Sequence, residues 1–166
     1  MDNDSPAREV DELRREAQPI ASKTESTELR SAAEALDRLR YRFGRLERIA
    51  LKLEGGEPST DSEHLLAFGI VLAVQAAEDA ARSLLVLDGA GVGVRDQDLF
   101  PRLALFGLLR DEHAAMLLPL QTLRTDLVRS YDSIDIRKLV PQLGPKLHAL
   151  MAFSNAMAGI LSAFRS

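Results

Sequence analysis

Two arginines and a tyrosine stand close together in the second half of the chain and are the residues best suited to phosphate chemistry. Arg124 and Tyr131 are seven positions apart, so they share one face if the helix that carries them continues. Arg129 lies about 140° around a regular helix from Arg124. Arginine binds phosphate oxygens through a planar fork of N–H donors. The spacing therefore predicts a site for RNA or a nucleotide phosphate, and the alternative is the solvated end of an ordinary helix.

A local positive patch is required for any such contact, because the chain as a whole is acidic. The formal net charge is -4 over 166 residues, so the surface in general does not attract nucleic acid. Arg110, Arg137 and Lys138 lie near Arg124 in the sequence. We predict that they join it in one patch.

Metal and cofactor chemistry is not expected. The chain has no cysteine, which excludes thiolate zinc sites, disulfides and a cysteine nucleophile. The histidines, His64, His113 and His148, fall on three different predicted helices without a partner at ligand spacing. The glycine-rich stretch from Asp88 to Val94 follows no strand and lacks a Gly-Lys-Ser/Thr sequence, so we interpret it as a flexible connector and not as a phosphate loop.

Two adjacent carboxylates interrupt the most apolar predicted helix. Glu78 and Asp79 must find partners there or lie at its edge, because an unpaired buried charge is costly. We expect one to be exposed and the other to pair with an arginine.

Apolar residues repeat with the alternating three and four spacing of an amphipathic helix, and no segment alternates like a strand. The fold class is therefore predicted to be all-α, an up-and-down bundle of four to five helices. The predicted helices are residues 29–53, capped by Ser26 or Thr27 and ended by Gly55 and Gly56; 64–87, capped by Asp61 or Ser62; a short helix from Asp96 or Asp98 to Gly107; one from Asp111 to about Arg129; and a last helix capped by Asp135.

Residues 1–25 carry few large apolar side chains and are predicted to be a disordered or weakly helical arm ahead of one domain at 26–165. They do not resemble a secretory signal, and the longest apolar run, Leu65 to Val74, is too short to cross a bilayer. A cytoplasmic protein that does not contact a membrane is therefore expected. The long apolar stripes of the first and last helices make a homodimer plausible.

The stretch from Arg124 to Tyr131 resembles the ribonuclease motif of the HepT family of HEPN-domain proteins. That motif is an arginine, four residues beginning with a polar one, a histidine, one residue and a tyrosine. The likeness extends to LAVQAAEDAARSLL at 72–85, to LALFGLL around Gly107 and to YDSID at 131–135, and it covers residues 35–162.

The resemblance implies a HEPN-like helical dimer whose motifs face one cleft, forming the toxin half of a toxin–antitoxin pair. The usual antitoxin is a small MNT-type nucleotidyltransferase. In the family the toxin cuts RNA without a metal, and the partner silences the toxin by transferring AMP to the motif tyrosine. For this chain we expect no cofactor and no DNA partner. Carried over, Arg124 would bind or stabilise the phosphate and Tyr131 would accept AMP.

Two positions depart from the family pattern. Arg129 stands where the catalytic histidine belongs, and Thr125 replaces the common asparagine. Histidine exchanges protons near its pKa of about 6.5, whereas arginine stays protonated to a pKa above about 12. We therefore interpret the chain as a HepT-like component with impaired or absent nuclease activity that binds RNA, a nucleotide or its nucleotidyltransferase. The alternatives are an active metal-independent endoribonuclease that uses Tyr131 or His113, and a purely structural helical dimer.

Overall fold

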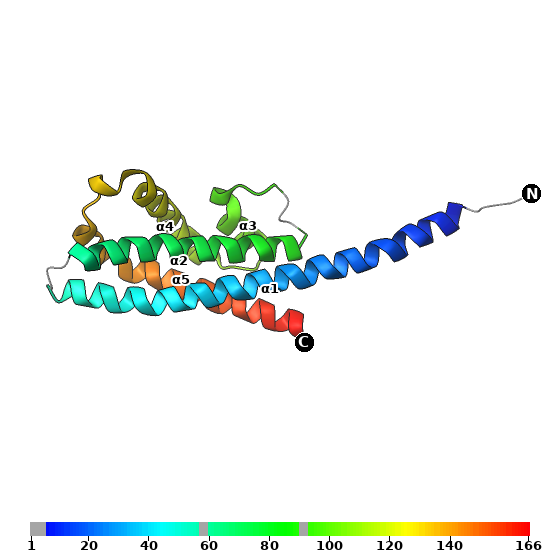
Figure 1. Ribbon diagram of the computed structural model, residues 1–166, viewed down its shortest axis with the longest axis horizontal. Coiled ribbons are helices and arrows are strands. Elements are labelled where there is room, and N and C mark those ends of the chain that lie inside the picture. The colour runs from blue at the N-terminus through cyan, green and yellow to red at the C-terminus, as the bar shows by residue number, and fades with distance from the viewer. Residues whose placement is uncertain (1–5, 57–59, 90–92) are drawn as a thin grey trace, which may run out of the picture.

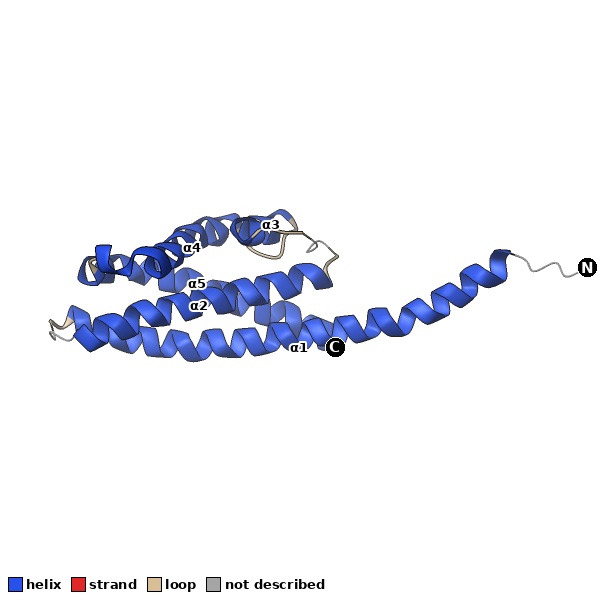
Figure 2. Ribbon diagram, turned by 45° about the horizontal axis from the view of Figure 1, so that its top comes forward, coloured by secondary structure: helices blue, strands red, loops and turns tan. Residues whose placement is uncertain are grey.

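A computed structural model describes residues 6–56, 60–89 and 93–166, of which 6–22 and 24 are described by backbone alone. These residues form five α-helices and contain no strand, so the predicted all-α bundle is confirmed (Figure 2). The helices are α1 (Pro6–Glu54), α2 (Thr60–Leu87), α3 (Leu99–Leu105), α4 (Asp111–Ser130) and α5 (Ile136–Arg165), with the 3-10 turns η1 (Asp96–Asp98) and η2 (Tyr131–Ser133).

Helix α2 is the centre of the bundle, as its apolar and alanine-rich sequence predicts. It packs against α1, α3, α4 and α5, and Figure 1 shows it between α1 and the α3–α4 layer. Its alanines allow close approach on several sides: Ala73, Ala77 and Ala80 are completely buried. Glu78, the one acidic residue buried among the described side chains, lies on this helix.

Helix α1 begins much earlier than predicted. The expected caps, Ser26 and Thr27, lie inside the helix, and the Thr27 hydroxyl donates to the carbonyl oxygen of Lys23 one turn back. The early part of α1 projects beyond the other helices (Figures 1 and 2). Whether residues 1–25 act as a separate arm stays a prediction. The predicted end is confirmed, since α1 stops at Glu54 and Gly56 takes a φ of +79°.

The other helix ends lie close to their predicted positions. Helix α2 starts at Thr60, before the expected caps Asp61 and Ser62, and Asp61 and Glu63 lie in its first turn, where acidic residues complement the helix dipole. Gly107 ends the α3 segment with a φ of +73°. The Asp135 carboxylate accepts hydrogen bonds from the backbone N–H groups of Arg137 and Lys138, as predicted for a helix cap. Residues 90–92 of the glycine-rich stretch lie outside the described residues.

Helix α5 is long and apolar enough to cross a membrane by length and composition alone, and no other helix of the described residues is. Its apolar residues form the core stripe that the sequence predicts. Leu143, Leu147, Leu150, Met157 and Leu161 are buried in the bundle. The apolar composition of α5 is therefore explained by its packing against α1, α2 and α4.

Candidate functional site

The predicted motif falls where α4 ends. The helix is continuous from Arg124 to Arg129 and stops at Ser130, whose φ of -143° and ψ of 41° are not helical. Tyr131 then opens the η2 turn. Because α4 ends before Tyr131, Arg124 and Tyr131 do not share one face of a continuous helix.

Arg124 points inward and is paired with a buried carboxylate. Its guanidinium lies 3.1 Å from Glu78 Oε2, with the side chains 26% and 4% exposed respectively. Gln121 Nε2 donates to Glu78 Oε1 at 2.9 Å and to the backbone oxygen of Asp96 at 2.8 Å. This Glu78 cluster joins α2, α4 and η1. It also confirms that one of the two adjacent acids pairs with an arginine.

The Glu78 cluster is strained electrostatically. Burial raises the pKa of the Glu78 carboxyl above its ordinary value, and the hydrogen bond from Gln121 and the charge of Arg124 offset only part of that effect. Arg124 Nε and Gln121 Oε1 are buried without a hydrogen-bond partner among the described residues. Asp79, by contrast, is partly exposed and pairs with Arg38 and Arg82 at 3.6 Å each.

Tyr131 lies in a different environment from Arg124. Its ring packs against the ring of His64 with centroids 5.3 Å apart. Both line an apolar cavity of about 320 Å³ together with Phe68 and Val128. Burial, then the nearby carboxylates of Glu63 and Asp132, raise the pKa of the Tyr131 phenol.

Arg129 and Thr125 complete the set of predicted site residues. Arg129 is exposed and makes no ion pair within the described part of the chain. The Thr125 hydroxyl donates to the Gln121 carbonyl oxygen at 3.1 Å, so it points back along the helix. No described cavity is lined by Arg124 together with Arg129 or Tyr131.

The predicted positive patch does not form. Arg110 precedes the first turn of α4, at the opposite end from the motif, and pairs with Glu112. Arg137 is paired with Glu63, and Lys138 lies 3.9 Å from Asp135. The prediction was wrong because nearness in sequence does not reveal the carboxylates that helix packing brings beside each cation.

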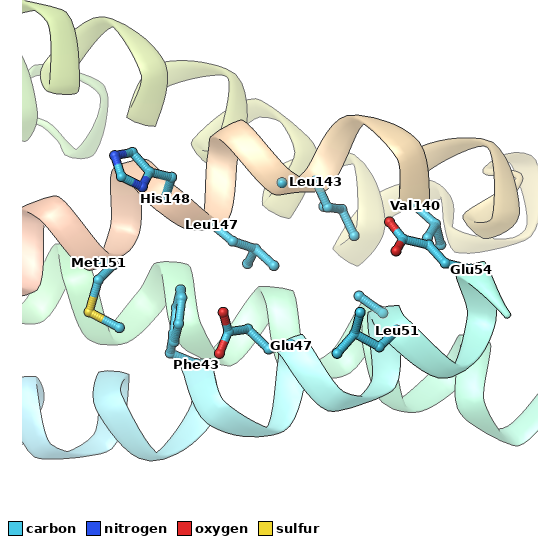
Figure 3. Close-up of a pocket in the computed structure, with 11 residues that line it drawn as sticks. Phe43, Glu47, Leu51, Glu54, Val140, Leu143, Leu147, His148 and Met151 are labelled. Atoms are coloured by element: carbon cyan, nitrogen blue, oxygen red, sulfur yellow. The ribbon is translucent and has the colours of Figure 1, made fainter.

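The largest described cavity is elsewhere, between α1 and α5 (Figure 3). It has a volume of about 530 Å³ and is lined mainly by apolar side chains. Its polar lining residues are Glu47, Glu54 and His148. None of the predicted site residues contributes to it. The described residues contain no group of three or more side chains able to hold a metal ion.

Two features of the structure were not predicted from the sequence. His64, on α2, contacts Tyr131 across 67 positions, and no spacing rule connects such distant residues. The second feature is a group of arginines around the exposed ring of Tyr41 on α1. The sequence does contain a signal for this group, because positions 38–52 hold six basic residues and one acidic residue, which indicates a locally basic surface.

Comparison with known proteins places the fold. No protein-family model matches the sequence, and no curated protein matches it. Among solved structures, the chain is similar to a chain of one described as "Crystal structure of the toxin-antitoxin with AMP-PNP". The TM-score is 0.58 at 13% identity, covering 82% of this chain and 98% of the other. The two chains thus share a fold over almost the whole length of the other chain.

Proposed function

We propose that this protein is a HepT-like component of a cytoplasmic toxin–antitoxin module in which RNA cleavage is impaired or lost. It acts by binding RNA, a nucleotide or an MNT-type nucleotidyltransferase. The observation that carries the proposal is the state of the two motif arginines. Arg129 occupies the histidine position, and Arg124 is bound to the buried Glu78 carboxylate.

Both features oppose cleavage. Arg129 is a permanent cation, so it cannot take a proton from the attacking 2′-hydroxyl group. Loss of one general acid–base group lowers a rate by about a hundred- to ten-thousand-fold. Arg124 already uses its charge on Glu78, so its attraction for a phosphate is reduced. The fold shared with a toxin–antitoxin structure supports the module, and the HEPN resemblance of residues 124–131 supports the type of toxin.

A homodimer is part of the proposal and has a candidate surface. Leu65, Phe68 and Val128 are 49%, 60% and 66% exposed. Phe68 and Val128 line the same cavity as Tyr131. Large apolar side chains exposed together favour an interface. A Phe68→Glu variant should shift a dimer toward monomer in light scattering, and an unchanged mass would place the interface elsewhere.

The proposed loss of RNA cleavage is tested by incubating the purified protein with RNA in the presence of EDTA. An Arg129→His variant is assayed in parallel. We expect intact RNA with the unaltered protein, because no group at position 129 exchanges protons at neutral pH. Cleavage gained only in the variant would support a degenerate site. Strong cleavage by the unaltered protein would contradict it.

The partner part is tested with the nucleotidyltransferase encoded beside the gene, if one is present, and ATP. We expect an AMP mass increment on the tryptic peptide 130–137, which contains Tyr131. A Tyr131→Phe variant is the matched control and should take up no AMP. An active transferase that leaves Tyr131 unmodified would exclude it as acceptor.

One observation favours the active ribonuclease as a second candidate. The imidazole of His64 packs against the ring of Tyr131, and histidine is the side chain that enzymes most often use as a general acid or base. His64 is preferred to His113, which lies in the first turn of α4, about 25 Å along the helix axis from Ser130 at 1.5 Å per residue. If the unaltered protein cuts RNA, a His64→Ala variant should lose that activity.

A further inference from the structure

Helix α1 carries a second set of arginines around a tyrosine, far in sequence from the motif. Tyr41 is 59% exposed. The guanidinium of Arg45 donates to its hydroxyl at 2.9 Å, and the guanidinium carbons of Arg42 and Arg45 lie 5.5 and 5.7 Å from its ring centroid. Arg48 adds a further nearby positive charge. We call Tyr41, Arg42, Arg45 and Arg48 the α1 basic face.

The charges of the α1 basic face are not neutralised. Arg42, Arg45 and Arg48 form no ion pair with any described carboxylate, whereas Arg38, Arg82, Arg124 and Arg137 each do. The hydrogen bond from Arg45 and the charges of Arg45, Arg42 and Arg48 lower the pKa of the Tyr41 phenol. A shift of that direction on an exposed group reports a locally positive surface on an acidic protein.

Positive charge beside an exposed aromatic ring matches the chemistry of a nucleic acid strand. Arginine forks bind phosphate oxygens, and a tyrosine ring or a guanidinium plane stacks on an unpaired base. An acidic peptide would use the charges alone, whereas an unpaired base can also contact the exposed ring. A regular duplex would hide its bases from Tyr41, so a single strand fits the combination better.

The α1 basic face is also connected to the rest of the candidate site. Arg42 and Arg45 line a shallow cleft with Leu65 and Phe68 of α2. Phe68 in turn lines the cavity that contains Tyr131. The α1 basic face therefore borders the apolar surface proposed for the homodimer and would remain outside that interface.

We propose that single-stranded RNA binds to the α1 basic face, with its phosphates on Arg42, Arg45 and Arg48 and one base stacked on Tyr41. This inference names the surface through which the RNA binding of the proposed function occurs, and so rests on that function in part. Its arginines differ from Arg124 of the motif in that no described carboxylate pairs with them. Residues 124–131 are not required for the contact.

The test is fluorescence anisotropy of a labelled single-stranded RNA of mixed sequence with the full chain at several salt concentrations. The variant Arg42→Gln, Arg45→Gln, Arg48→Gln should bind at least tenfold more weakly. It should also flatten the slope of log K against log salt by about 2, since each phosphate contact on a single strand contributes about 0.7. Tyr41→Leu should lose about tenfold through stacking alone.

The matched control removes the same charge elsewhere, with Arg95→Gln, Arg110→Gln and Lys138→Gln, all exposed and ion-paired. It should bind RNA within about threefold of the unaltered protein and keep the same salt slope. Both quantities depend mainly on the cations that contact phosphates and not on the net charge of the protein. Circular dichroism and thermal melting check that every variant folds. Equal losses in the two triple variants, or no binding by the unaltered protein, would overturn the proposal.

Two further measurements distinguish a failure of this binding proposal from a failure of the proposed function. Tighter binding of a DNA strand or of double-stranded RNA than of single-stranded RNA would overturn the assignment of the ligand. The bound RNA is then run on a denaturing gel. Cleaved RNA would contradict the loss of nuclease activity and leave the binding surface in place, whereas full binding by the α1 triple variant would contradict the surface alone.

Discussion

The two tyrosines of this chain lie in opposite electrostatic settings. At the end of α4, Tyr131 is half-buried beside Glu63 and Asp132, and Arg124 is held by Glu78. On α1, Tyr41 is exposed among Arg42, Arg45 and Arg48. The charge of Arg124 is therefore offset by a buried carboxylate, whereas no described carboxylate pairs with the arginines beside Tyr41.

The difference shows that a motif identifies residue types and not the charges that packing adds. Arg124 is the member of the motif best suited to bind a phosphate, and it is also the one whose charge is offset by the buried carboxylate of Glu78. The arginines of the α1 basic face belong to no motif. They flank the apolar stripe of α1, and the excess of basic residues at positions 38–52 is the signal that the sequence gives for them.

The largest effect is expected from removing the buried acid. Glu78→Ala leaves Arg124 and Gln121 without their partner, and breaking a buried ion pair costs about 3 to 5 kcal/mol. The lower value is expected here because Arg124 retains some contact with solvent. Asp79→Ala, at the neighbouring exposed pair, should cost about 0 to 1 kcal/mol in the same urea titration. Similar losses for both variants would show that the Glu78 cluster is not a buried pair.

A smaller, pH-dependent effect should come from the raised pKa of Glu78. Between its ordinary pKa of 4.5 and the higher folded value, the folded state binds more protons than the unfolded state. The contribution of Glu78 to stability is therefore full below pH 4.5 and is lost as pH rises through the folded pKa. The difference in unfolding free energy between the unaltered protein and Glu78→Gln should vary with pH in that window and be flat above it. A difference that grows in favour of the unaltered protein as pH rises would mean that the folded pKa is lowered.

The cap beside the motif should have a more modest effect. Asp135→Ala removes the acceptor of two backbone N–H groups at the start of α5 and should cost about 1 kcal/mol in thermal unfolding. Asp132→Ala, which removes an exposed carboxylate that caps no helix in the structure, is the control and should change stability by less than about 0.5 kcal/mol. A loss in the control as large as in Asp135→Ala would attribute the effect to charge and not to capping.

The smallest change is a spectroscopic one, and it compares the two tyrosines directly. In Tyr131→Phe the remaining phenol is Tyr41 and should titrate below the ordinary tyrosine pKa, because Arg45 stabilises its phenolate. In Tyr41→Phe the remaining phenol is Tyr131 and should titrate above that value. Ultraviolet absorbance titration of the two variants measures both. Adding Arg45→Gln to Tyr131→Phe should raise the pKa of Tyr41, and an unchanged value would remove Arg45 as its cause.

Local signals predicted much of the fold. The three and four spacing of apolar residues predicts the helices, Gly56 the end of α1, and Asp135 the start of α5. The early start of α1 at Pro6 was missed because that segment has no apolar stripe strong enough to indicate a helix. For the site, the sequence indicates that Glu78 or Asp79 needs a cation. It does not indicate that the cation is Arg124, because that pairing depends on how α4 packs on α2.

The most direct test of the account is ultraviolet crosslinking of single-stranded RNA to the full chain, followed by a protease that cuts after Asp and Glu. The two regions then give separate peptides with one tyrosine each, 38–47 and 127–132. The account predicts an RNA adduct on peptide 38–47, at Tyr41, and recovery of the remaining RNA uncut. An adduct confined to peptide 127–132 would contradict it.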